Sequence, residues 1–300
     1  MIAVTGATGH TGKVVAESLL AAGEKVRVIG RNADKLQPFV AKGAEAFVGN
    51  VLDTDAMTRA FQGVNAAYVM IPPDLKQPKM RAYMDDVTES LGNALEKALV
   101  KYAVSLSSVG AQLSEGAGPV SGLHGFEARL NRTIGLNVLH LRAGYFMENT
   151  LMCVQVYKTM GFYAALLKGD LPIGQIASWD IGARAAAELR ALKFSGQNVT
   201  ELLGQRDISL NEAAKIFGAA IGKPGLGYTQ APAMMAKPAL MQAGLSADGA
   251  DQMIEMSKAD NEGRMVPLEK RNESNTTPTT FESFTAEVLV PAFKGQSASA

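Results

Sequence analysis

Three glycines near the start of the chain are spaced to bring backbone against a charged ligand. Gly6, Gly9 and Gly12 lie in "VTGATGHTGK", after the apolar run "IAV" and before a segment with helical periodicity. Glycines allow close backbone approach, and the N-terminus of the following helix offers unpaired N–H groups and the positive end of its dipole. Strand, loop and helix together predict a pyrophosphate-binding loop of a dinucleotide site; a tight turn without a ligand is the alternative.

The end of the next apolar segment indicates which dinucleotide is bound. A site for NAD places Asp or Glu there to accept from the ribose hydroxyls, whereas the 2′-phosphate of NADP needs a cation. This chain has Gly30, Arg31 and Asn32 at that point, with Lys35 one turn later. The guanidinium of Arg31 suits a phosphate, so the sequence predicts NADP(H) held by Arg31 and Lys35. A solvated surface arginine is the alternative.

These residues need elements to position them, and the first half of the chain alternates apolar runs with helical patterns, as parallel βαβ units do. Helices are expected near residues 13–22, 32–36, 53–64 and 79–100. Strands are expected within residues 2–6, 25–31, 44–50, 65–73, 101–110 and 137–146. This order predicts an α/β fold with a doubly wound parallel sheet, in which ligands lie outside the carboxyl ends of the strands.

The alternation weakens after Asn149. A helix with Asp180 as its N-cap and a strand over 198–204 are expected to return to the sheet, and Ser209 and Glu212 have capping-box spacing. The methionines between residues 228 and 265 are expected to fill a helical core or, alternatively, to form an adaptable wall over a flat ligand. They are Met234, Met235, Met241, Met253, Met256 and Met265.

Together these patterns predict a division into two lobes. A Rossmann domain is expected over residues 1–150, with 177–206 returning to it. Residues 151–176 and 207–293 are expected to form a smaller, mainly helical substrate lobe. The small and polar residues 294–300 are expected to be a disordered tail.

Composition excludes several classes of partner. The 29 basic and 29 acidic side chains balance, so neither a nucleic acid nor a membrane surface is expected to bind. Cys153 is the only cysteine, and the three histidines are scattered, so no disulfide and no metal site are expected. No apolar run approaches the roughly 18 residues that cross a bilayer, and a cytoplasmic protein is expected. The oligomeric state stays open, with a homodimer as one alternative.

Longer motifs resemble a known family. "VTGATGHTG" with "IGR" is similar to the short-chain dehydrogenase/reductase superfamily, and four later segments resemble its atypical NmrA-like branch: "SLSSVGA", "LRAGYFMENTL", "ASWDIGARAAAEL" and "TTFESFTAEVLVPAF". The resemblance runs from Ile2 to about Phe293. It implies an NADP-binding Rossmann lobe, a small C-terminal lobe and a cleft between them. Family members include reductases of quinones, azo dyes and triphenylmethane dyes, and regulators that sense the NADPH/NADP ratio.

The resemblance also implies site residues, position by position. The pyrophosphate would be held by Gly6, Thr8, Gly9, His10, Thr11 and Gly12. Arg31 would hold the 2′-phosphate, and Asn50 would lie beside the adenine. The path from adenosine to nicotinamide would be lined by Met70, Ile71 and Pro72. The nicotinamide end would include Gly144, Tyr145, Phe146 and Asn149, the last two also touching substrate. Ser107 would contact the cofactor and Ser108 the substrate, unless both only bond backbone.

The usual acid of the superfamily is missing. Most short-chain reductases protonate the new alkoxide with a Tyr whose pKa is lowered by a Lys four residues later. None of the seven tyrosines has Lys at that spacing, and "PVSGLHGFEARL" has Val120 and His124 where the pair should lie. Some relatives carry a lysine at the position of His124. His124 is therefore a candidate cofactor contact and proton source, or alternatively a histidine on a helix surface.

Loss of this acid favours acceptors that are easily reduced. A reduced quinone is a stabilised phenolate, a cationic dye becomes neutral, and an azo bond is intermediate and could use His124. The sequence predicts an NADPH-dependent, flavin-free reductase of a conjugated aromatic acceptor, with His124 and Tyr145 as catalytic candidates and Tyr145 and Phe146 stacking on planar substrates. The alternatives are a non-catalytic NADP(H)-sensing regulator with a protein partner and, more weakly, a sugar-nucleotide epimerase.

Overall fold

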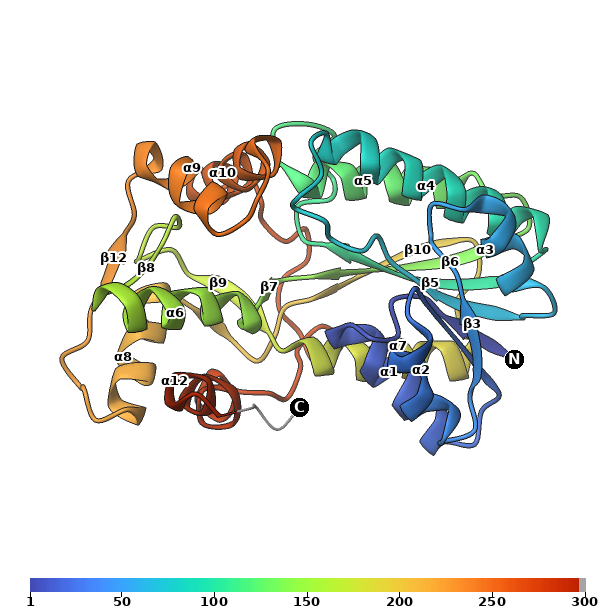
Figure 1. Ribbon diagram of the computed structural model, residues 1–300, viewed down its shortest axis with the longest axis horizontal. Helices are drawn as coiled ribbons and strands as arrows, with labels where there is room; N and C mark the ends of the chain where they lie inside the picture. Colours follow the sequence, from blue (N-terminus) through green and yellow to red (C-terminus); the bar gives the residue numbers. More distant parts are fainter. Residues whose placement is uncertain (297–300) are drawn as a thin grey trace.

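A parallel sheet of seven strands forms the centre of the computed structural model, which describes residues 1–296 (Figure 1). The strands are Ile2–Val4 (β1), Val26–Gly30 (β2), Glu45–Val48 (β3), Ala66–Val69 (β4), Tyr102–Ser108 (β5), Asn137–Ala143 (β6) and Gln197–Leu202 (β10). Their order across the sheet is β10-β6-β5-β4-β1-β2-β3. The predicted doubly wound sheet is therefore confirmed.

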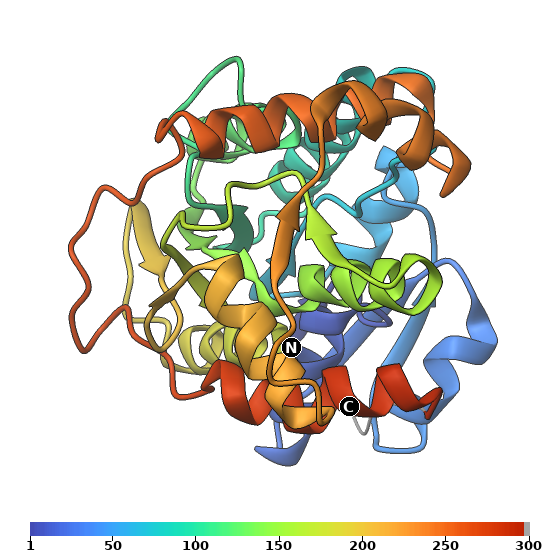
Figure 2. The same ribbon diagram turned by 90° about the vertical axis from the view of Figure 1, so that its left-hand side faces the viewer.

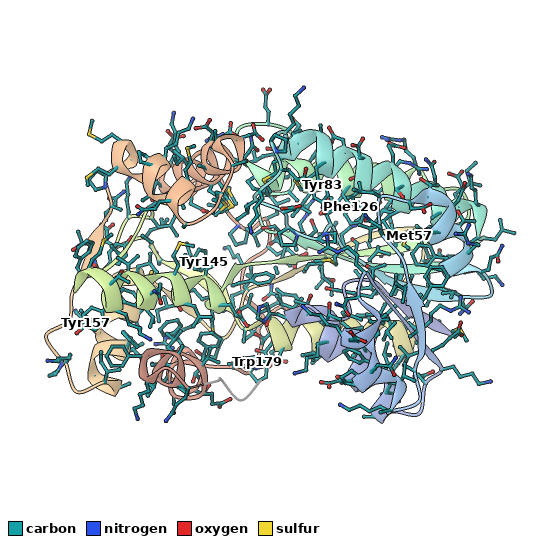
Figure 3. All side chains as sticks on the ribbon, in the orientation of Figure 1. Met57, Tyr83, Phe126, Tyr145, Tyr157 and Trp179 are labelled. Carbon is teal, nitrogen blue, oxygen red and sulfur yellow. The ribbon has the colours of Figure 1, made fainter. Side chains whose placement is uncertain are left out.

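Helices cover both faces of this sheet, and alternate strand residues feed two separate cores. On one face lie His10–Ala21 (α1), Ala33–Val40 (α2) and Ser178–Ala191 (α7); on the other lie Thr54–Phe61 (α3), Met80–Lys97 (α4) and Pro119–Asn131 (α5) (Figure 1). Val4 and Val28 point into the first core, whereas Ala3 and Ile29 point into the second. Met57 and Phe126 belong to the second core (Figure 3).

The strand order reverses between β1 and β4. The chain proceeds from β1 through β2 to β3 at one edge, and then from β4 through β5 and β6 to β10 at the other. In sheets of this kind a ligand lies across the point of reversal, outside the carboxyl ends of the strands. One half of a dinucleotide is thus expected over β1 to β3, and the other half over β4 to β6.

A second lobe follows the strand β6. Its strands are Tyr145–Phe146 (β7), Tyr163–Ala165 (β8), Ile173–Ile176 (β9), Asp207–Ile208 (β11) and Tyr228–Gln230 (β12). Its helices are Met147–Asn149 (η1), Thr150–Met160 (α6), Leu210–Ala220 (α8), Ala233–Gln242 (α9), Ala247–Asn261 (α10), Phe281–Phe284 (α11), Thr285–Leu289 (η2) and Val290–Lys294 (α12). Figure 2 shows β8 beside β12, with α10 on the side of the molecule that carries α4 and α5. Within residues 1–296, no helix has the length and apolar character to cross a membrane.

The structure differs from the sequence expectations at three places. Asp180 is the third residue of α7 rather than its N-cap, and its carboxylate accepts from the backbone and hydroxyl of Thr279. Met234 and Met235 are 86% and 65% exposed, so they do not fill a core. Lys294 ends a helix and the N–H of Gln296 donates to a carbonyl, so the expected tail is ordered at least that far. Residues 297–300 lie outside the described range.

Candidate active site

The glycine loop joins β1 to α1. Gly6 has a φ of +62°, in the left-handed region that favours glycine, and its carbonyl accepts from the N–H of Gly9 at 2.9 Å. Gly9 is the N-cap of α1, and it has no side chain to satisfy the N–H groups of the first turn. These N–H groups are therefore available to an anion at the positive end of the helix.

The packing around the loop requires glycine for a second reason. A Cβ at Gly12 would lie 2.2 Å from the carbonyl oxygen of Gly6, and a Cβ at Gly6 would lie 2.9 Å from the sulfur of Met70. The first clash is with backbone, which cannot swing aside as a side chain can. The loop therefore brings α1 close to β1 and places Met70 against Gly6, as a pyrophosphate cradle requires.

The remaining residues of the loop have two different roles. Thr8, Gly9 and His10 are exposed, so they can contact a ligand. Thr11 is buried, and its hydroxyl accepts from the hydroxyl of Tyr68 on β4 at 2.9 Å. Burial raises the pKa of Tyr68, which keeps the phenol protonated as a donor. This bond ties the loop to β4 on the far side of the reversal point.

Arg31 directly follows β2 and Lys35 lies in the first turn of α2, and both side chains are exposed. Neither side chain makes a hydrogen bond or an ion pair with any residue between 1 and 296, whereas the side chain of Arg27 on β2 is held by Glu45 at 2.9 Å. The side chain of Asn32 caps α2 by accepting from the N–H of Lys35. Two cations without a partner at this strand end fit a phosphate.

Arg31 also lies near the first turn of α4. Its positive charge lowers the pKa of Tyr83, although burial and Asp74 raise that pKa overall. The hydroxyl of Tyr83 donates to the carbonyl of Pro72 at 2.9 Å and closes one side of a cavity of about 120 Å³. Ile71 and Pro72 line the same cavity. Of the four residues predicted on the adenosine side, Met70, Ile71 and Pro72 thus come together, while the exposed Asn50 uses its side-chain oxygen within its own turn.

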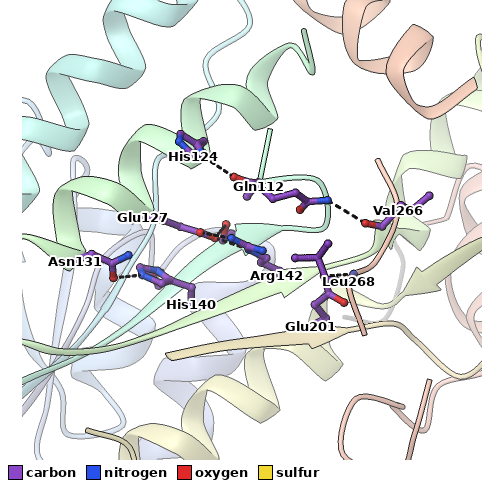
Figure 4. Close-up of polar contacts among 12 residues, drawn as sticks. Gln112, His124, Glu127, Asn131, His140, Arg142, Glu201, Val266 and Leu268 are labelled. Carbon is purple, nitrogen blue, oxygen red and sulfur yellow. Dashed lines mark hydrogen bonds and ion pairs between the residues drawn. The ribbon is translucent and has the colours of Figure 1, made fainter. Parts of the chain in front are cut away.

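At the carboxyl end of β5, Ser107 belongs to a buried ionic network. Its hydroxyl donates to Glu127 of α5 at 2.5 Å, and Glu127 is paired with Arg142 of β6 at 2.6 Å (Figure 4). The Glu127 contact also raises the pKa of Arg142. The proton of the Ser107 hydroxyl is therefore directed at Glu127, while the half-buried Ser108 donates to the carbonyl of Val109. No sequence pattern predicts this network, because its members come from three elements.

His124 lies on α5 and is half-buried. Its Nδ1 is 2.9 Å from the carbonyl oxygen of Ala111 (Figure 4). Since a carbonyl only accepts, Nδ1 donates in this contact, and Nε2 makes no hydrogen bond with the residues between 1 and 296. His124 thus has a fixed ring with one nitrogen left for a ligand, at the end of the loop that follows β5.

Tyr145 follows Gly144 directly after β6, and Figure 3 places it on the side of α6 that faces α10. Burial raises its pKa well above the usual range, and the nearby Cys153, Tyr228 and Asp260 add to the effect. Its hydroxyl makes no hydrogen bond within the described part of the chain. Tyr145 is therefore a phenol that keeps its proton, which makes it a hydrogen-bond donor and a poor acid.

Tyr145 and Phe146 do not form one stacking wall, contrary to the expectation. They are neighbours on a strand, so their side chains point to opposite faces. Tyr145 packs with the core of the second lobe and Phe146 with a core of the Rossmann sheet. Asn149 is exposed at the start of α6. A Cβ at Gly144 would lie 2.5 Å from the carbonyl oxygen of Gly174, so glycine is needed where β9 crosses this end.

One candidate residue was missed from the sequence. Asp260 is half-buried in the last turn of α10, and burial raises its pKa to about 7. It follows Met253 and Met256 by seven and four positions, which puts a carboxylate on the same helix face as two methionines. This spacing could have indicated Asp260 from the sequence. No cluster of His, Cys, Asp and Glu within residues 1–296 could hold a metal ion.

Comparisons with known proteins identify relatives that match most of the chain. The model of the NmrA-like family matches residues 1–285. An NAD(P)H azoreductase of Xenophilus azovorans is 28% identical over 257 residues, covering 85% of this chain and 86% of that protein. A (4-alkanoyl-5-oxo-2,5-dihydrofuran-3-yl)methyl phosphate reductase of Streptomyces griseus is 29% identical and covers 80% of each chain. A crystal structure of an NADPH-dependent quinone oxidoreductase of Escherichia coli, complexed with NADPH, has a TM-score of 0.81 at 24% identity and covers 96% of this chain and 100% of that one.

Proposed function

Because the chain belongs to the NmrA-like family, we propose that it is an NADPH-dependent, flavin-free reductase that transfers hydride to a conjugated aromatic acceptor of quinone, azo or triphenylmethane type. The observation that carries the proposal is the glycine cradle at the uncapped N-terminus of α1, with the unpaired Arg31 at the end of β2. Three relatives support the reaction class: an NAD(P)H azoreductase, a furanone phosphate reductase and a quinone oxidoreductase.

The residues of the first half would bind the cofactor. The N–H groups after Gly9 face the pyrophosphate, and Arg31 with Lys35 neutralises the 2′-phosphate. The bound cofactor supplies the hydride. Met70 and Pro72 line the path from one half of the site to the other. This use of unpaired cations distinguishes NADPH from NADH, since NADH has no phosphate at that position.

The residues of the second half would orient the acceptor. Tyr145 keeps its phenolic proton and donates a hydrogen bond to an oxygen or nitrogen of the acceptor. His124 presents Nε2, because Nδ1 is held by Ala111. Neither residue has the lysine four positions away that ordinary carbonyl reduction uses, so the proposal is restricted to conjugated acceptors whose reduction spreads the new electron pair over a π-system.

A panel assay tests the proposal. Purified protein free of flavin is mixed with NADPH and, in turn, with a quinone, an azo dye and a triphenylmethane dye, and the loss of NADPH absorbance is followed. We expect turnover with at least one acceptor, much weaker turnover with NADH, and none in a Gly12→Ala variant. Tight NADPH binding without turnover on the whole panel would overturn the proposal, and so would equal rates with NADH.

A further inference from the structure

A half-buried carboxylate without a partner lies in the last turn of α10. Asp260 is half-buried, yet within residues 1–296 its carboxylate makes no hydrogen bond and no ion pair. Its charged neighbours along the chain are all engaged: Lys258 pairs with Glu262, and Arg264 binds Glu262 and the carbonyl of Gly116. Buried carboxylates are normally paired, so a solitary one calls for a functional explanation.

The environment of Asp260 places it at the carboxyl ends of β5 and β6. Its negative charge raises the pKa of Tyr145, which follows β6, so the carboxylate and the phenol interact electrostatically. Ala259, the preceding residue, packs with Ala111 and Val120, which belong to the connection after β5 and to the start of α5. This is the half of the sheet over which the reactive half of a dinucleotide is expected.

The last turn of α10 is held from both lobes. The side chain of Asn261 accepts from the N–H of Lys168 at 2.7 Å and donates to the carbonyl of Leu166 at 3.0 Å. On the other side, Arg264 donates to the carbonyl of Gly116 at 2.6 Å. Asp260 directly precedes the first of these two attachments, so its position is set before any ligand binds. A catalytic group benefits from such fixed placement.

The charged groups near Asp260 do not pair with it, which leaves burial as the cause of its raised pKa. The phenol of Tyr145 interacts electrostatically with Asp260, and Lys168 uses its ammonium on the carbonyl of Asn261. On the other helices packed against α10, Lys237 is paired with Asp251 and Arg81 with Asp85. None of them makes an ion pair with Asp260. Burial alone therefore raises its pKa to about 7, so much of it is protonated near neutral pH.

We propose that Asp260 is the acid that protonates the acceptor in the reaction proposed above, taking the place of the missing Tyr and Lys pair. For an azo acceptor, hydride adds to one nitrogen and the N=N π-bond breaks, leaving an electron pair on the other nitrogen. The O–H bond of Asp260 then breaks, and its proton forms the second N–H bond. The products are the hydrazo compound, the oxidised cofactor and the Asp260 carboxylate, which takes a proton from water. This inference rests on the proposed function.

Two acceptors with different proton needs separate this role from a structural one. A neutral azo dye must gain a proton, whereas a cationic triphenylmethane dye becomes neutral on accepting hydride at carbon and needs none. We expect Asp260→Asn to lower kcat for the azo dye by about 100-fold, the lower end of the range for general acid catalysis, and to leave kcat for the cationic dye within about twofold. The matched control is Asp251→Asn, an exposed aspartate on the same helix. It should leave both rates unchanged.

The pH dependence gives a second test. In the wild type, kcat for the azo dye should fall as pH rises through about 7, because Asp260 loses its proton, whereas kcat for the cationic dye should not follow this titration. Equal losses for both dyes in Asp260→Asn would overturn the role of Asp260 and leave the proposed function intact. No turnover of any acceptor by the wild type would contradict the proposed function and the role of Asp260 with it.

A third readout needs no turnover. Since the folded pKa of Asp260 is raised above its unfolded value, its contribution to stability is fully present at pH 4 and is lost as pH rises through about 7. Asp260→Asn removes this loss, so the variant should gain stability relative to the wild type between pH 4 and pH 8 in urea unfolding. For Asp251→Asn, the difference from the wild type in the free energy of unfolding should be the same at every pH. A constant difference for Asp260→Asn would mean that its carboxyl is already ionised in this range and would overturn the proposal.

Discussion

The two ends of the site are built in opposite ways. At the cofactor end the groups that we propose to meet the ligand are backbone N–H groups at the start of α1 and the exposed cations Arg31 and Lys35. At the acceptor end the titratable groups Tyr145 and Asp260 are at least partly buried, and burial raises the pKa of both. The difference teaches that binding a phosphate needs only available donors, whereas moving a proton needs an environment that changes a pKa.

The largest effect is expected at the buried network behind the acceptor end. Glu127→Ala leaves Arg142 with an uncompensated charge in the interior, so we expect a loss of about 3–5 kcal/mol in the free energy of unfolding, measured with denaturant. The matched control is Glu89→Ala, whose carboxylate pairs with Arg129 but is 59% exposed and should cost no more than about 1 kcal/mol. Similar losses in both variants would show that burial does not distinguish the two ion pairs.

The next effect concerns the cradle. In Gly12→Ala the new Cβ meets the carbonyl of Gly6, and the loop must move away from the helix N-terminus. We expect NADPH affinity to fall by about 100-fold, equivalent to one or two charge-assisted hydrogen bonds, in a calorimetric titration. Gly225→Ala has open space around the new Cβ and serves as the control. An unchanged NADPH affinity in Gly12→Ala would show that the glycine loop does not hold the cofactor.

Arg31 should control the choice between the two cofactors. We expect Arg31→Ala to weaken NADPH binding by about 10- to 100-fold, the worth of one charged hydrogen-bonding group, and to leave NADH binding unchanged. Arg190→Ala removes an arginine that is also exposed but lies in the last turn of α7, and should change neither. If Arg31→Ala weakened the binding of NADPH and NADH equally, the guanidinium would not bind the 2′-phosphate.

The smallest effect is expected from the phenol at the acceptor end. Tyr145→Phe removes one neutral donor and keeps the ring, so we expect kcat/KM for the acceptor to fall by about 2- to 10-fold while NADPH affinity stays constant. Tyr157→Phe on α6 is the control, since that ring packs on Phe217 and Phe293 away from β6. A loss in Tyr145→Phe as large as that of Asp260→Asn would make Tyr145 the acid instead.

Much of the cofactor end could be predicted from the sequence because its determinants are local. Glycine spacing, an apolar strand before it and a helical pattern after it all lie within one short segment, and Arg31 is identified by its place at a strand end. The alternation of strands and helices likewise predicts a parallel sheet, because a parallel pair needs a crossover. Six of the seven strands of the sheet were expected within the first half of the chain.

The acceptor end could not be predicted in the same way. Ser107 was expected to meet a ligand, but it donates to Glu127, and no sequence pattern connects those positions. Tyr145 and Phe146 were expected to stack on one substrate, but strand geometry turns them to different cores. Asp260 was overlooked, because its importance depends on burial against segments that are distant in the chain.

The amino-acid sequence by itself determined the doubly wound sheet, the glycine loop and the cation at the end of β2, since backbone conformation and exposed charge depend on neighbouring residues. Only the tertiary structure decided which side chains have altered proton affinities. That property comes from the water excluded when α10 packs beside the ends of β5 and β6, and no stretch of sequence contains it.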